Sequence, residues 1–70
     1  MVNEWNLQTF IFHLVGRAGK AFFAYEGDFD ALLEELDNDK KTLLVYTPDT
    51  NSTPMRVALL KDKIIGVEEY

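Results

Sequence analysis

The first third of the chain contains two runs of aromatic and aliphatic residues, "QTFIFHLV" (8–15) and "KAFFAYEG" (20–27), separated by "GRAG" (16–19). Two such runs joined by a short loop with glycine predict a β-hairpin. A competing interpretation is an amphipathic helix over residues 4–15 that ends at Gly16, because apolar residues also recur there at i, i+3, i+4 and i+7. The residues with this helical spacing are Leu7, Phe10, Ile11 and Leu14.

The middle of the chain carries a clearer helical pattern. In "GDFDALLEELDND" (27–39) the apolar residues again follow i, i+3, i+4, i+7. Asp28 can cap the first turn, and Asp30 lies where the positive end of the helix dipole favours an acid. The segment therefore predicts a helix of about two turns with one apolar stripe. The stripe consists of Phe29, Leu32, Leu33 and Leu36.

Three further strands are predicted after this helix. "TLLVYT" (42–47) and "MRVALL" (55–60) flank a proline-bracketed loop, and "KDK" (61–63) is a turn before "IIGVEEY" (64–70). The predicted order is ββαβββ. Strands that run together around a single helix indicate the α+β class. We expect one small domain over residues 1–70, with a mostly antiparallel five-stranded sheet or a partly closed barrel and one short helix.

The predicted strands are apolar on both faces, and this pattern favours self-association. One short helix cannot cover two faces of a five-stranded sheet, so closure into a barrel, packing of Trp5 or a second subunit must bury the remainder. An ordinary small core with some exposed aromatics is the alternative. We expect a homo-oligomer at micromolar concentration. The residues assigned to its interface are Phe10, Phe12, Phe23, Tyr25 and Tyr46.

Charge is concentrated in one part of the chain. The net charge is −5, and residues 26–39, called the acidic segment below, contain no base. Carboxylates near the C-terminal end of a helix oppose its dipole, so fold stability alone does not explain them. A solvated helix face is the simplest interpretation, and a surface for a partner protein is the functional one. The partner-binding candidates are Asp30, Glu34, Glu35, Asp37 and Asp39.

The residues that catalysis or cofactor binding would need are scarce. "GRAGK" (16–20) is too short for a phosphate-binding loop and Ala21 replaces its hydroxyl residue. His13 and Ser52 are single residues of their kinds, there is no Cys, and "DND" (37–39) lacks the glycine and distal glutamate of a calcium loop. We expect no catalytic residue, no metal and no cofactor.

The sequence thus predicts a non-enzymatic protein-binding module with an acidic helix that meets a basic protein surface. The first alternative is an acidic mimic of nucleic acid that inhibits a DNA- or RNA-binding protein. The second is a small-ligand carrier with an aromatic pocket and Arg17, Lys20 or Arg56 at its rim. The acidic net charge argues against direct nucleic-acid binding. The start of the chain has no basic region before its short apolar run, so we expect a cytoplasmic protein without membrane contact.

Overall fold

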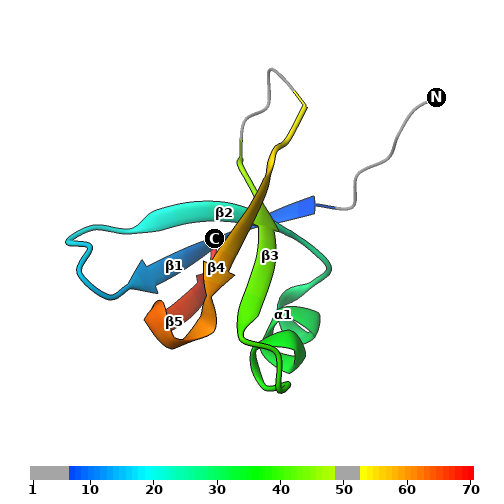
Figure 1. The fold of residues 1–70 in the computed structure, drawn as a ribbon. Coiled ribbons are helices and arrows are strands. Elements are labelled where there is room, and N and C mark those ends of the chain that lie inside the picture. Colours follow the sequence, from blue (N-terminus) through cyan, green and yellow to red (C-terminus); the bar gives the residue numbers. More distant parts are fainter. Residues whose placement is uncertain (1–6, 49–52) are drawn as a thin grey trace.

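The computed structural model describes residues 7–48 and 53–70, and it has the predicted ββαβββ order. Trp5 and Ser52 lie outside these residues. A single five-stranded sheet and one helix make up the α+β fold (Figure 1). The elements are β1 (Leu7–Leu14), β2 (Ala21–Glu26), α1 (Phe29–Leu36), β3 (Thr42–Tyr46), β4 (Arg56–Leu60), a 3-10 turn (Lys61–Lys63) and β5 (Ile64–Glu69).

The first two strands form the predicted antiparallel hairpin, in which Phe12 lies opposite Ala21. The helical interpretation of this segment is wrong for residues 7–14. Phe10 and Phe12 alternate with residues on the other face, and this two-residue period lets aromatic side chains pack across strands. Gly16 takes a φ of 78° in the connecting loop, a conformation that glycine adopts without steric cost.

The sheet is strongly curved. Its order is β4-β3-β2-β1-β5, so the last two strands lie at opposite edges although only the Lys61–Lys63 turn joins them. Four strand spacings in a flat sheet would separate these edges by about 19 Å, and a three-residue 3-10 turn rises only about 6 Å. The sheet must therefore bend toward itself. It remains open, because no ladder joins β4 to β5.

The bend is located where β2 meets β3. Their ladder consists of one residue pair, Ala24 opposite Tyr46, whereas β3 and β4 pair along their whole length. The β3–β4 hairpin therefore turns away from β2 and crosses the first hairpin at a steep angle (Figure 1). This arrangement gives the sheet a concave inner face and a convex outer face.

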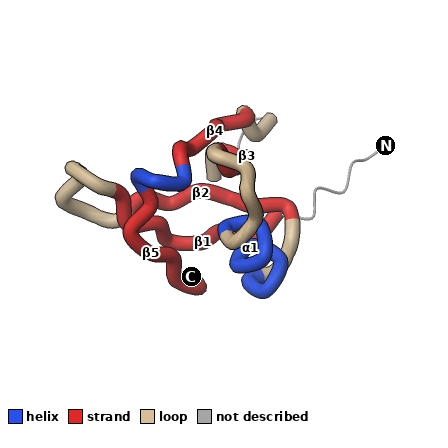
Figure 2. Tube along the Cα trace, turned by 60° about the horizontal axis from the view of Figure 1, so that its bottom comes forward, coloured by secondary structure: helices blue, strands red, loops and turns tan. Residues whose placement is uncertain are grey.

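The core lies on the inner face, and α1 closes one end of it. Leu32 of the helix and three strand residues, Phe12, Leu43 and Val45, are completely buried. The rings of Phe10 and Phe29 lie 5.8 Å apart and join β1 to the start of the helix. Figure 2 shows α1 at one end of the curved sheet, beside β1 and the segment that leads into β3.

The aromatic residues assigned to an oligomer interface lie mainly inside the single chain. Phe10, Phe12 and Tyr46 are buried, and Phe23 and Tyr25 pack partly buried against the core. Curvature of the sheet turns the face with Phe10 and Phe12 inward. Phe10, Phe12 and Tyr46 thus have little exposed surface in one chain, and both the predicted interface and self-association stay predictions.

The outer face retains half-exposed apolar side chains. Phe22 meets Tyr70 edge to face, with ring centroids 5.4 Å apart, above β1 and β2. Leu44 and Leu60 lie on the outer face of the β3–β4 hairpin and are 46% and 51% exposed. The strands are thus apolar on both faces as expected, and the exposed side chains of Phe22, Leu44 and Leu60 lie on the outer face.

Candidate functional site

The acidic segment contains a helix that its own sequence caps. Asp28 accepts a hydrogen bond from the backbone N–H of Ala31 at 2.9 Å, which satisfies one of the free donors of the first turn. On the side of the helix that faces the core, Leu32 is buried and Phe29 and Leu36 are partly buried. Leu33, the remaining residue of the predicted apolar stripe, is 43% exposed. A two-turn helix on a curved sheet buries a stripe too narrow for two adjacent leucines.

Leu33 instead belongs to an outward-facing surface with three carboxylates. Asp30, Glu34 and Asp37 are exposed, and their spacing of i, i+4, i+7 places them on the same helix side as Leu33. We call these four residues the acidic helix face. Asp39 is exposed just beyond the helix. The structure thus brings together Asp30, Glu34 and Asp37 from the predicted set and adds Leu33, a member of the predicted apolar stripe.

The fifth predicted acid, Glu35, lies apart from the acidic helix face. It is partly buried and lines a small hollow of about 280 Å³ with Tyr25, Glu26 and Lys40. Burial raises the pKa of the Tyr25 phenol above its ordinary value near 10, and the carboxylates of Glu35 and Glu26 raise it further. The structure therefore assigns Glu35 to the junction between helix and sheet.

The C-terminal end of α1 receives a positive charge from a distant part of the chain. The Lys61 ammonium donates to the backbone carbonyl of Glu35. It also donates to two oxygens of Asn38, the backbone carbonyl at 3.4 Å and the side-chain Oδ1 at 2.5 Å. These bonds satisfy carbonyls that a helix end leaves without a partner and oppose the negative end of the dipole. Local sequence gave no signal of this cap, because Lys61 lies 26 residues after Glu35.

Among the described residues, no base forms an ion pair with a carboxylate of the acidic helix face. Across residues 7–48 and 53–70, the one ion pair joins His13 to Glu68 on the other side of the sheet, at 3.2 Å. Lys61 bonds carbonyl and amide oxygens rather than these carboxylates. The acidic helix face therefore combines an exposed apolar side chain with three negative charges that no described base pairs.

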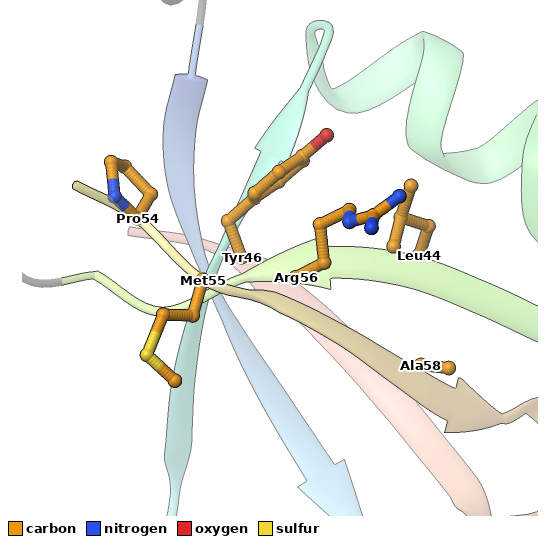
Figure 3. Close-up of a pocket in the computed structure, with 6 residues that line it drawn as sticks. All are labelled: Leu44, Tyr46, Pro54, Met55, Arg56 and Ala58. Atoms are coloured by element: carbon orange, nitrogen blue, oxygen red, sulfur yellow. The ribbon is translucent and has the colours of Figure 1, made fainter.

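A second hollow lies on the outer face of the β3–β4 hairpin, with a volume of about 700 Å³. Figure 3 shows Leu44, Tyr46 and Arg56 on one side of the hairpin and Met55 pointing to the other. Its lining residues are Leu44, Tyr46, Pro54, Met55, Arg56 and Ala58. Of the three bases predicted to hold a ligand, Arg56 is at this hollow. Arg17 and Lys20 are exposed in the β1–β2 loop and do not line it.

The two hollows adjoin, because Leu44 and Tyr46 line both. A continuous surface therefore runs from the carboxylates of Glu26 and Glu35 to the guanidinium of Arg56. Proximity to aromatic and apolar side chains suits peptide or aromatic ligands more than a free ion.

The remaining polar candidate, His13, is partly buried and contacts Glu68 through Nε2. No nucleophilic side chain bonds it among the described residues, and Ser52 lies outside them. In the same part of the chain, no group of three or more His, Asp or Glu residues is arranged to hold a metal ion. The described residues also contain no helix of the length and apolarity that crossing a membrane requires.

Comparison with known proteins gave no relative: no family model, no curated protein sequence and no solved structure matches this chain.

Proposed function

We propose that this protein is a non-enzymatic protein-binding module whose acidic helix face docks against a basic surface of a partner protein. The observation that carries the proposal is Leu33, which is 43% exposed on the same helix side as Asp30, Glu34 and Asp37. An exposed apolar side chain with charged neighbours matches the composition of a protein interface, in which the apolar group supplies affinity and the charges steer the approach.

A protein partner explains this surface better than mimicry of nucleic acid. A polyanion mimic needs carboxylates repeated over a long array, and a helix of eight residues extends only about 12 Å. An exposed leucine also has no counterpart in a phosphate backbone. Mimicry stays the first alternative, and it predicts that DNA competes with this protein for the partner.

A small-ligand carrier is the second alternative, and the hollow beside Arg56 favours it. Tyr46 and Leu44 offer an aromatic and an aliphatic wall, and the guanidinium could pair with an anionic group. This alternative predicts a copurified ligand, which native mass spectrometry of the purified protein would detect as an added mass that Arg56→Ala removes.

The proposed function is tested by isolating a partner from native lysate and measuring its affinity for matched variants. Leu33→Ala should weaken binding about tenfold or more, mainly through faster dissociation. The double variant Glu34→Gln, Asp37→Asn should slow association and reduce the salt dependence of binding.

The matched control is the single variant Glu68→Gln, compared with Glu34→Gln alone. Each variant removes one negative charge, and Glu68 is exposed on the other side of the sheet, where it contacts His13. If this control slows association as much as the helix variant, the effect is one of overall charge and the acidic helix face is not the docking site. Displacement of the partner by DNA would select the mimic instead.

A further inference from the structure

The two edges of the sheet differ in how they are protected. At one edge, β5 has a register shift opposite His13 and Leu14 and carries Glu68 and Glu69. Bulges and charges are the features with which natural sheets prevent edge pairing. At the other edge, β4 pairs with β3 without a shift, and Arg56 is its one charged residue. The β4 edge is therefore regular and largely apolar.

The backbone of β4 offers hydrogen-bonding groups to a further strand. Thr47 donates to the carbonyl of Met55, and Lys61 donates to that of Lys41, which fixes the bonded pairs of the β3–β4 ladder. Because bonded and non-bonded pairs alternate in an antiparallel ladder, every second residue of β4 directs its N–H and C=O away from β3. These residues are Arg56, Ala58 and Leu60.

A second copy of the same strand fits this edge in one register. Antiparallel pairing centred on Ala58 places Ala58 opposite Ala58 and Arg56 opposite Leu60, so that all three outward-directed residues of each copy are bonded. The charges agree with this register. Each Arg56 lies across from Leu60, two residues from Asp62, and its aliphatic stem can cover the half-exposed leucine. Parallel pairing would place Arg56 beside Arg56.

We propose that two copies of this protein associate through β4 in this antiparallel register, joining their sheets into one continuous sheet. The outer-face residues beside the edge, Leu44 and Leu60, then lie at the junction of the two copies. This surface is separate from the acidic helix face, so the dimer does not depend on the proposed function. It places self-association at edge residues of β4 and not at the five aromatic residues predicted from the sequence.

The first test is a charge reversal at one position. Leu60→Lys places a cation opposite Arg56 of the second copy, whereas Leu60→Glu places an acid there. Both variants remove the same apolar side chain. Sedimentation equilibrium of the wild type should show a mass that rises with concentration toward twice the 8.1 kDa of one chain. The lysine variant should raise the dimer dissociation constant about tenfold or more relative to the glutamate variant. Thermal melts establish that both variants are folded.

The second test uses the absence of cysteine from the chain. Facing residues of a bonded antiparallel pair have Cα atoms about 5.5 Å apart, within the range of about 4.4–6.8 Å that a disulfide spans. Ala58→Cys should therefore form a covalent dimer under mild oxidation. The control Ile65→Cys, at the exposed bulge of the opposite edge, should form it at least tenfold more slowly.

Three results would overturn the proposal. The first is a wild-type mass that stays at 8.1 kDa at millimolar concentration, because the β4 edge would then be free or would bind a strand of another protein. The second is an equal dimer dissociation constant for the lysine and glutamate variants. The third is cross-linking of Ala58→Cys that is no faster than that of Ile65→Cys, which would place a dimer interface elsewhere.

Discussion

The inner and outer faces of the sheet are built from similar residues and yet differ in burial. In β3, Leu43 and Val45 are 0% exposed, and Leu44 between them is 46% exposed. Adjacent residues of a strand point to opposite faces, so curvature of the sheet encloses one set and leaves the other at the surface. Hydrophobicity along the strand therefore does not reveal which residues stabilise the fold.

The helix repeats this contrast. Leu32 is buried against the inner face, whereas Leu33 lies on the acidic helix face. The inner residue of each pair has its contacts inside the chain, and the outer one is available to another molecule. If this division is correct, substitutions on the inner face should lower stability, and those on the outer face should change association.

The largest contrast is expected within β3. Leu43→Ala should lower the free energy of unfolding by about 2–5 kcal/mol, because it leaves a cavity in the core. Leu44→Ala should lower it by less than about 1 kcal/mol, since the side chain is half exposed in the folded state. Urea denaturation of both variants measures the difference, and equal losses would show that the outer face is buried in the protein in solution.

A smaller loss of unfolding free energy is expected when the cap at the C-terminal end of α1 is removed. Lys61→Met removes the charged donor to Glu35 and Asn38 and should cost about 1–2 kcal/mol. Lys63→Met, an exposed lysine of the same turn, should change the unfolding free energy by no more than about 0.5 kcal/mol. A loss equal to that of Lys61→Met would mean that general charge, and not the helix cap, sets the effect.

The acids near the C-terminal end of α1 should contribute little or negatively to stability. Glu35→Gln with Asp39→Asn should leave the melting temperature unchanged or slightly raised, because each carboxylate lies toward the negative end of the helix dipole at a cost of a few tenths of a kcal/mol. Differential scanning calorimetry at low salt checks this. A melting temperature lower by several degrees would show that these acids are paired within the fold.

The smallest effect is confined to alkaline pH. Because the pKa of Tyr25 is raised in the folded state, its neutral form contributes stability that is present below a pH of about 10 and is lost as the pH rises through the folded pKa. Tyr25→Phe should therefore reduce the fall in unfolding free energy as the pH rises above about 10. A fall as steep as in the wild type would indicate that the phenol ionises freely in the folded protein.

The sequence by itself determined the order of the elements and the local signals at their ends. Residue spacing indicated the helix, Asp28 indicated its cap, and the run around "GRAG" favoured the hairpin that forms. These features depend on interactions between residues close in the chain, which is why a local pattern could predict them. The acidic segment was equally visible, because charge is read directly from composition.

Tertiary structure alone decided which apolar residues are buried and which distant residues meet. A three-residue turn between opposite edges forces the sheet to curve, and this curvature turns Phe12 inward and leaves Leu44 outside. The same turn brings Lys61 to the end of α1, a contact between residues far apart in sequence. Periodicity records that residues alternate between two faces, but the bend that makes one face concave arises from the connection of the whole sheet.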